Sequence, residues 1–504
     1  MSEYTQIYGR LSKSRIPLDT KRVLAFIASA AIFPLISCSG VKNPCTVNCG
    51  GGSGKATLIL TLAAVPFTPP PGTSVLSFAV TLNSVSLTPS TGGSDVNIPL
   101  NIASYSVDLM RLQSDSAFLA QRIGTVPTGT YNQLSVNLNA VVTYCTATSG
   151  TPGCDMGSIT QITKSFATPT VSSFSLSLSA NQKAGLRLLI NLANVLTTNP
   201  LTQMVTAVDL TAANVVTTLA LPPATSTLSS GQFDYIEDVT GVVTAASSSS
   251  VTVHTATRGS FTSAITSTTI GSPNCVIQNT PCMPAVGQIA SLDATLNTDG
   301  TLTLLQFDPL SIESSDMIEG IVTTQNTSST EFRIVTNDLV PASKGSLISG
   351  LNLGDSINVT LAPNVLPFVI DSKGLPIVNS PFNGGTSATD ILPGQTVALR
   401  VTGFTAKSGN TEASAQVDVV VLRFTRVAAS VSGPPAPNFM IQSLPPFFGH
   451  NGPMQVQFGN GTPSTYLDGY SSTGSISTGD NLAIRALYFG LTAPAFTAAK
   501  VRKN

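Results

Sequence analysis

Hydrophobic and polar residues alternate along three stretches in the first half of the chain. The alternating apolar positions are Leu58, Leu60 and Leu62, then Leu76, Phe78, Val80 and Leu82, and then Leu134, Val136 and Leu138. A period of two places every second side chain on the same face of an extended strand, so the pattern predicts half-buried β-strands. We therefore expect an all-β fold.

The alternation is interrupted between Ser106 and Arg122, where the apolar spacing fits a strand leading into a short helix or an irregular crossing. Val126-Pro127-Thr128-Gly129-Thr130-Tyr131 follows this segment. Proline and glycine two positions apart favour a tight turn into the next strand. We expect Tyr131 to cover the end of a sandwich while its hydroxyl finds a backbone partner.

Glycine followed by glutamine or aspartate recurs at strand starts in the second half. The copies are Gly287-Gln288-Ile289-Ala290-Ser291-Leu292, Gly394-Gln395-Thr396-Val397-Ala398-Leu399 and Gly479-Asp480-Asn481-Leu482-Ala483-Ile484, which lie 107 and 85 residues apart. The pairs of expected strands before them are 240–243 with 251–253, 319–322 with 332–334, and 429–431 with 439–441. We infer a linker at 221–232 and then three small β-barrels at 235–312, 316–425 and 426–504. Repetition at this scale favours binding or spacer modules, since an enzyme needs only one site.

Two family resemblances support this organisation. The motifs that carry the first are Val107-Asp108-Leu109, Val126-Pro127-x-Gly129-x-Tyr131, Phe174-Ser175-Leu176 and the apolar run from Leu186 to Leu192. With them, residues 55–220 resemble an uncharacterised domain of bacterial envelope lipoproteins, which is similar to transthyretin-like and carbohydrate-binding sandwiches. The barrel segments resemble a second uncharacterised module of secreted bacterial proteins with an oligonucleotide-binding-like plan. These resemblances imply an all-β fold, a β-sandwich followed by about three barrels, and name no chemistry.

The amino-terminal segment has the anatomy of an export signal. Basic residues precede an apolar run at 23–37, which is too short for a comfortable membrane span of roughly 20 residues. Leu35-Ile36-Ser37-Cys38 then resembles the lipobox of bacterial lipoproteins, which implies that residues 1–37 are a signal peptide and that Cys38 carries lipid. Residues 38–54 would form a lipidated tether ending in Gly50-Gly51-Gly52-Ser53-Gly54, and Ser39 resembles the outer-membrane sorting choice. A plain secreted protein, an uncleaved anchor and a chance cysteine are the alternatives.

Composition excludes some partners. Residues 1–22 hold five basic and two acidic side chains, so the remainder carries 19 basic and 23 acidic residues, a net charge of −4. No basic stripe is present, which argues against nucleic acid as a partner. Only 10% of the residues are charged, and serine, threonine, glycine, asparagine and proline take their place. Such neutral polar surfaces suit β-sheets outside the cell.

Six further cysteines fall as near neighbours, namely Cys45 with Cys49, Cys145 with Cys154, and Cys275 with Cys282. Three local disulfides are the simplest pairing, although six cysteines allow 15 connectivities. Zinc binding is the rival interpretation, but no spacing is Cys-x-x-Cys and no histidine lies nearby. Disulfides would agree with an oxidising compartment.

The chain offers few groups for catalysis. Its two histidines read as a surface strand position, His254, and a loop position before an Asn-Gly turn, His450. Paired carboxylates could still make a glycosidase. The available acids are Asp108, Asp115, Glu237, Asp238, Glu313, Asp316 and Glu319, which we expect at solvated strand edges. Asn297-Thr298-Asp299-Gly300 is closer to a hairpin turn than to a calcium loop.

The sequence therefore predicts a lipid-anchored cell-envelope protein at the outer membrane, periplasmic or surface-exposed, with a non-catalytic binding or structural role. We expect no catalytic residue, metal or cofactor. Its partners would be the membrane, through the anchor, and a glycan or an envelope protein. Tryptophan is absent, which leaves nine tyrosines as stacking platforms for sugar. The alternatives are a surface polysaccharide hydrolase with paired carboxylates and an accessory subunit of an export or adhesion assembly.

Overall fold

Regular structure in the described part of this protein consists of β-strands and short 3₁₀ helices. The computed structural model describes residues 54–67, 69, 72–147, 150–154, 158–221, 228–271, 275–276, 284–311, 315–325, 328–409, 411–433, 438–450, 452–461 and 464–504. The 3₁₀ helices are η1 (Arg111–Gln113), η2 (Leu192–Asn194), η3 (Ala388–Asp390), η4 (Pro446–Phe448) and η5 (Thr473–Ser475). Within these ranges no helix is long and apolar enough to cross a bilayer. The expected all-β class, a sandwich followed by barrels, is confirmed.

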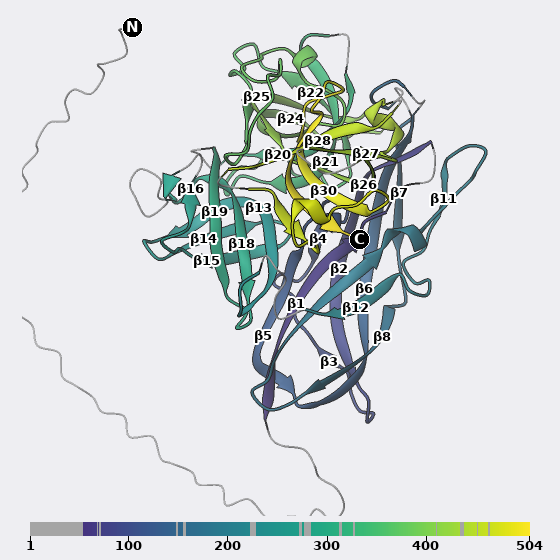
Figure 1. Cartoon of the computed structure of the whole chain (residues 1–504), viewed down its shortest axis with the longest axis vertical. Coiled ribbons are helices and arrows are strands. Elements are labelled where there is room, and N and C mark those ends of the chain that lie inside the picture. The colour runs from purple at the N-terminus through teal and green to yellow at the C-terminus, as the bar shows by residue number, and fades with distance from the viewer. Residues whose placement is uncertain are drawn as a thin grey trace, which may run out of the picture. The chain divides into compact units, whose positions relative to one another are not determined.

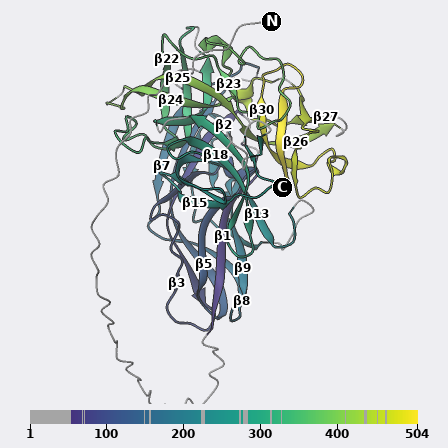
Figure 2. The ribbon, with the colours of Figure 1, turned by 90° about the vertical axis from the view of Figure 1, so that its left-hand side faces the viewer.

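The sandwich consists of two sheets and a hairpin. The first sheet has the order β12-β9-β1-β5 and contains β1 (Lys55–Val65), β5 (Ala117–Pro127), β9 (Lys183–Asn191) and β12 (Val216–Ala220). The second contains β2 (Thr73–Pro89), β3 (Val96–Asn97), β4 (Tyr105–Asp108), β6 (Gly129–Thr146), β7 (Thr160–Ser165) and β8 (Thr170–Leu178). Strands β10 (Leu196–Thr198) and β11 (Val205–Val208) form the hairpin. Figures 1 and 2 show the long sandwich strands extending below the barrel strands.

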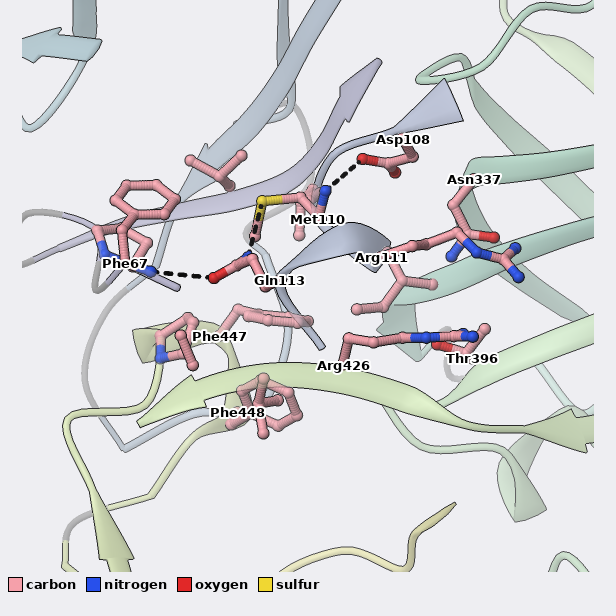
Figure 3. Close-up of a pocket in the computed structure, with 17 residues that line it drawn as sticks. Phe67, Asp108, Met110, Arg111, Gln113, Asn337, Thr396, Arg426, Phe447 and Phe448 are labelled. Atoms are coloured by element: carbon pink, nitrogen blue, oxygen red, sulfur yellow. Dashed lines mark hydrogen bonds between the residues drawn. The ribbon is translucent and has the colours of Figure 1, made fainter. Parts of the chain in front are cut away.

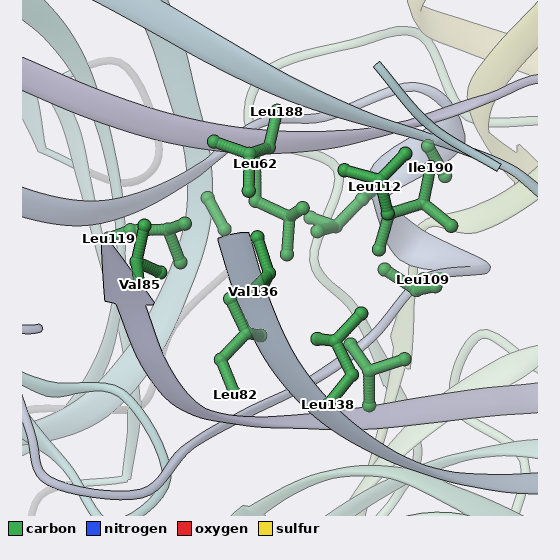
Figure 4. Close-up of a cluster of buried hydrophobic side chains, with 14 of the residues drawn as sticks. Leu62, Leu82, Val85, Leu109, Leu112, Leu119, Val136, Leu138, Leu188 and Ile190 are labelled. Atoms are coloured by element: carbon green, nitrogen blue, oxygen red, sulfur yellow. The ribbon is translucent and has the colours of Figure 1, made fainter. Parts of the chain in front are cut away.

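Alternating side chains from both sheets fill the sandwich core. Leu62 on β1 and Leu188 on β9 face Leu82 on β2 and Leu138 on β6, and all four are at most 1% exposed (Figure 4). Inward-facing positions therefore follow the period of two that the sequence shows. Leu112 joins this core from η1.

The interrupted segment and the Pro-x-Gly turn are as expected. Strand β4, helix η1 and strand β5 follow one another across residues 105–127. Gly129 has φ +145°, a conformation open to glycine, and begins β6 directly after β5 ends at Pro127. The Tyr131 side chain is buried, and its hydroxyl donates to the Pro127 carbonyl at 2.7 Å.

The second half of the chain contains three barrels with one topology. The first contains β13 (Gln232–Ala246), β14 (Ser250–Thr255), β15 (Gly259–Ala264), β16 (Ile270–Gly271), β17 (Cys275–Val276), β18 (Ile289–Asn297) and β19 (Leu302–Ser311). The second contains β20 (Met317–Gln325), β21 (Glu331–Val340), β22 (Ser356–Leu361), β23 (Val369–Ile370), β24 (Thr396–Thr405) and β25 (Ala413–Arg423). The third contains β26 (Thr425–Gly433), β27 (Asn438–Gln442), β28 (Met454–Phe458), β29 (Tyr466–Asp468), β30 (Asn481–Tyr488) and β31 (Phe496–Lys503).

Each barrel closes in the same way. Its first three long strands form an antiparallel meander, the fourth long strand pairs with the first, and the fifth pairs with the fourth. Parallel pairing of the third and fifth long strands then closes the barrel, as β15–β19, β22–β25 and β28–β31. This closure leaves few free edges and confirms the expected small β-barrels.

The repeated Gly-Gln/Asp motif is a tight turn that docks the fourth strand on the first. Its glycines are Gly287, Gly394 and Gly479, with φ of +93°, +92° and +91°. Their N–H groups donate to the carbonyls of Val243, Val322 and Val431 at 2.8–2.9 Å. The following Gln or Asp side chain accepts the N–H of the residue three positions earlier, at 2.8–2.9 Å. A positive φ at the third turn position fits a type II turn, which explains the glycine.

The sandwich and the barrels share their cores. Ile59 and Phe118 of the sandwich pack into the first barrel, and Phe118 meets Phe261 edge to face at 6.4 Å between ring centroids. Ala79 packs with the second barrel, and Leu76 packs with the third. The described residues of the sandwich and the barrels therefore bury apolar surface between modules as well as within them.

Candidate functional site

A large ionic cluster lies buried where the sandwich and the three barrels meet. The ionic cluster comprises Arg111, Asp115, Asp238, Arg258, Asp293, Asp308, Glu319, Asp338, Asp371, Lys373, Arg423, Arg426 and Arg485. Every one of these side chains is at most 7% exposed. Buried charges persist only when they are paired and hydrogen-bonded, so pairing decides what this cluster can do.

Asp238 is the central carboxylate. A bulge in β13 between Ile236 and Val239 puts it in a left-handed conformation with φ +57°, which turns it inward. Its carboxylate pairs with Arg423 and Arg426 and accepts the Ser291 hydroxyl at 2.8 Å.

The charges around Asp238 determine its ionisation. Burial alone would raise the pKa of Asp238, but the guanidinium groups of Arg423, Arg426 and Arg485 outweigh it and hold that pKa well below its ordinary value. Asp293 behaves similarly: burial opposes ionisation, yet Arg485 and Lys373 lower its pKa. Both carboxylates are therefore anions that are held by fixed cations.

Arg111 joins the sandwich to two barrels. It lies in η1, and its Nη1 donates to Glu319 at 2.8 Å and to Asp338 at 3.3 Å, while its Nη2 reaches Asp238 at 3.3 Å. Arg258 of the first barrel donates to the same Asp338 carboxylate at 2.6 Å. Burial would lower the pKa of Arg111, but Glu319, Asp338 and Asp238 raise it.

The expectation that the acids lie at solvated strand edges is wrong for five of them. Asp108, Asp115, Asp238, Asp316 and Glu319 are all at most 3% exposed. The physical reason is compensation: arginines neutralise three of them, while backbone N–H groups and a serine hydroxyl hold the others. Glu313 and the Glu237 side chain lie outside the described residues.

Two of these acids are held by backbone groups. Asp108 accepts the N–H groups of Phe78 and Met110, each at 2.9 Å, and burial raises its pKa. Asp316 accepts the N–H groups of Ala342 and Leu347 at 2.9 and 2.6 Å. Each carboxylate thus anchors a loop within its own module.

A small cavity of about 40 Å³ adjoins the ionic cluster (Figure 3). Arg111, Arg426 and Asn337 lie on one side of it, while Phe67 and Phe447 lie on the other. It has room for roughly two or three water molecules. It is therefore too small for an organic ligand.

Three open grooves on the sandwich and the first two barrels are lined almost entirely by uncharged residues. One of about 480 Å³ lies between the sandwich and the first barrel, with Phe118 and Phe261 in its lining, and one of about 560 Å³ lies on the second barrel beside Thr330 and Pro363. A third, of about 420 Å³, lies between the second sandwich sheet and the second barrel. Asp355 in the third groove is the one charged residue that lines any of these three.

The remaining predicted positions have structural surroundings. His254 is exposed on β14, as expected, with Nδ1 3.1 Å from the Ser260 hydroxyl. His450 Nδ1 lies 2.9 Å from the Gly452 carbonyl. The loop at 297–300 is the expected β18–β19 hairpin, with Gly300 at φ +85°. In the described ranges no group of three or more His, Cys, Asp or Glu residues could hold a metal ion.

One of the expected cysteine pairs is described. Cys145 on β6 and Cys154 form a disulfide, and both are buried. Its loop docks onto two barrels, because Gly153 donates to the Phe447 carbonyl at 2.6 Å and Cys154 donates to the Thr323 carbonyl at 2.8 Å. Cys38, Cys45, Cys49 and Cys282 lie outside the described residues, as does the Cys275 side chain.

Sequence reasoning missed the cations of the cluster. Arg423 stands between Leu422 and Phe424, and Arg485 stands between Ile484 and Ala486. A charged residue inside an apolar strand of a chain with so few charges is a usable signal for buried pairing. The partner of each arginine could not be read in this way, because Asp238 and Arg423 are 185 residues apart.

Fold and site together define a multi-module all-β protein built around internal ion pairs. Residues 61–220, the sandwich region, match the model of a family described as Domain of unknown function (DUF4382). No curated protein matches the chain.

Proposed function

We propose that this chain is a lipid-anchored protein of the cell envelope with a non-catalytic binding or structural role. The proposal rests on the burial and pairing of the candidate catalytic carboxylates. A retaining or inverting glycosidase needs two carboxyl groups about 5 to 10 Å apart that face a substrate cleft. In the described residues, five of the seven candidate acids are instead buried and held by arginines or backbone donors. This weakens the hydrolase alternative.

The location rests on the amino-terminal segment. Leu35-Ile36-Ser37-Cys38 supports lipidation of Cys38 after removal of residues 1–37, and Ser39 supports the outer membrane. The Cys145–Cys154 disulfide is compatible with an oxidising compartment. The grooves, with Asp355 as their one charged lining residue, support a neutral partner, which we infer to be a glycan or an envelope protein. We further propose that the sandwich is of the transthyretin-like or carbohydrate-binding-like type.

The anchor is tested with two matched variants. Cys38→Ala should abolish lipidation, because the acceptor thiol is gone, and should leave an unprocessed or soluble form. Ser39→Ala leaves the thiol in place and should be processed and sedimented with membranes. The measurements are membrane fractionation and mass spectrometry of the mature amino terminus, with globomycin as a chemical control. Full processing and unchanged membrane fractionation of Cys38→Ala would contradict the anchor.

A further inference from the structure

The outer face of the second sandwich sheet carries aligned rows of small polar side chains. Strands β2, β6 and β7 are paired in register, and the rows that they form are Thr81 with Asn139 and Ser165, Ala79 with Val141 and Thr163, and Ser77 with Thr143 and Gln161. Because side chains alternate along a strand, these positions share one face of the sheet. Ser106 on β4 extends the first row, and its hydroxyl lies 2.9 Å from that of Thr81.

The second barrel forms one wall over these rows. The tight turn at Gly354-Asp355 packs against them, since Thr143 and Gln161 donate to the Gly354 carbonyl at 2.6 and 3.0 Å. A Cβ atom at Gly354, where φ is +87°, would meet the Thr143 hydroxyl at 3.1 Å, so glycine permits this close approach. On another side the backbone N–H of Ser106 donates to the Thr257 carbonyl of the first barrel at 2.8 Å. The result is the groove of about 420 Å³ between three modules, here called the sheet groove.

The sheet groove presents neutral groups that both donate and accept hydrogen bonds. Thr163 and Ser165 are exposed in it, and Thr81 and Asn139 are half-buried. Its one carboxylate, Asp355, already accepts the Asn352 N–H at 2.8 Å and the Gln161 amide at 3.2 Å. Hydroxyl and amide groups of this kind match ligand hydroxyls, which also donate and accept.

The groove also has an apolar component without aromatic rings. Ala79 and Val141 make the middle row mostly apolar, and Leu351 and Leu353 line the groove from the second barrel. These side chains can contact the C–H surface of a sugar ring. Among the described residues no phenylalanine or tyrosine side chain is exposed, which points to weaker binding than a platform of such rings would give.

The floor strand of the sheet groove has no free edge for a peptide that binds as an added strand. Strand β6, which forms the floor, is paired with β2 along one edge and with β7 along the other. Strand addition needs a free edge, so a ligand over β6 meets side chains. Among the described strands β7 pairs with β6 alone, so the uncharged peptide in the test below checks strand addition at β7. We propose that the sheet groove binds a neutral, hydroxyl-rich oligosaccharide. This inference rests on the proposed binding role and names its ligand class.

The test uses the full chain in a detergent that has no sugar headgroup. Neutral hexasaccharides (cellohexaose, maltohexaose, mannohexaose and xylohexaose) are titrated by calorimetry, together with hexagalacturonate and an uncharged Ser/Thr/Gly/Asn peptide. Ser165→Arg and Thr163→Arg each place a long cationic side chain at an exposed groove position. Ser175→Arg makes the same change at an exposed position on β8, outside the groove lining.

We expect at least one neutral hexasaccharide to bind, with affinity reduced at least tenfold in both groove variants and unchanged in Ser175→Arg. Hexagalacturonate and the peptide should not bind at the groove. The inference is overturned if no neutral hexasaccharide binds or if the groove variants bind the hexasaccharide as well as the parent protein does. It is also overturned if the peptide binds and none of the hexasaccharides does. Release of new reducing ends in the same samples would overturn the proposed non-catalytic role, independently of whether the groove variants lose binding.

Discussion

At the scale of single residues, the chain uses its scarce charges inside the molecule. Arg423 and Asp238 are fully buried and form an ion pair across the boundary between the second and first barrels. An isolated ion in such a site would be prohibitively costly, so each member depends on the others. The sequence shows charged residues at apolar strand positions, but it cannot show compensation by partners more than 100 residues away.

Removing one central charge should destabilise the protein strongly. Asp238→Asn removes the carboxylate that Arg423 and Arg426 share, and breaking a buried pair in this way typically costs about 3–5 kcal/mol of the free energy of unfolding. Asp418→Asn is the control, because the Arg400–Asp418 pair has side chains 25% and 18% exposed. There the expected loss is at most about 1 kcal/mol. Urea unfolding followed by circular dichroism measures both, and equal losses would contradict the argument.

At the scale of elements, local pattern predicted most of what forms. Alternation located the strands, and the Gly-Gln/Asp motif marked three strand starts. The same turn also occurs at Gly231-Gln232 and Gly354-Asp355, which the sequence reading did not single out because the first opens β13 after the linker and the second lies between strands of one barrel. What the motif could not indicate is what each turn packs against, because that depends on the neighbouring barrel.

Two alanine substitutions separate turn geometry from packing. Gly287 and Gly394 have almost the same positive φ, but a Cβ at Gly287 meets nothing within 4 Å, whereas one at Gly394 would meet Phe448 at 2.8 Å and Tyr488 at 3.1 Å. Gly287→Ala should therefore cost about 1–2 kcal/mol for the backbone conformation alone. Gly394→Ala should cost about 1–3 kcal/mol more, because it overpacks the contact with the third barrel.

Urea midpoints of the two variants, analysed with a common m-value, give this difference. A larger loss in Gly287→Ala than in Gly394→Ala would show that the contact at Phe448 and Tyr488 is not tightly packed.

At the scale of the whole described region, the ionic cluster links the stability of four modules. Asp238, Glu319 and Arg426 belong to the three different barrels, and Arg111 belongs to the sandwich. Loss of charge on one carboxylate therefore weakens contacts in several modules at once. We expect the modules to unfold together rather than one by one.

Acidification should lower the free energy of unfolding through the ionic cluster. The pKa values of Asp238 and Asp293 lie below the ordinary value, near 3.9 in an unfolded chain, so their stabilisation is complete above that pH and is lost as the pH falls through the folded pKa values. Burial raises the pKa of Asp108, which acts in the opposite direction and offsets part of the loss.

The free energy of unfolding should therefore be nearly constant from pH 7 to about 5 and should decrease below about pH 4. At each pH the modules should still unfold in one cooperative transition. Urea titrations at stepped pH measure it, with Asp238→Asn expected to show a shallower fall because one linked carboxylate is gone. Stability that stays flat to pH 3, or separate transitions for separate modules, would count against a shared cluster.

Short-range sequence pattern was enough to predict the strand-rich class, the Pro-x-Gly turn at Tyr131 and the repeated Gly-Gln/Asp turns, and it favoured the local Cys145–Cys154 pairing. These depend on side-chain periodicity and backbone conformation over a few neighbouring residues. Packing between modules, which short-range pattern does not reveal, brings Asp238 to Arg423, Arg111 to Glu319, and Asp355 to a groove that Asn139 also lines. Those contacts join residues far apart in the chain, and burial and charge compensation at such contacts follow from how the modules pack.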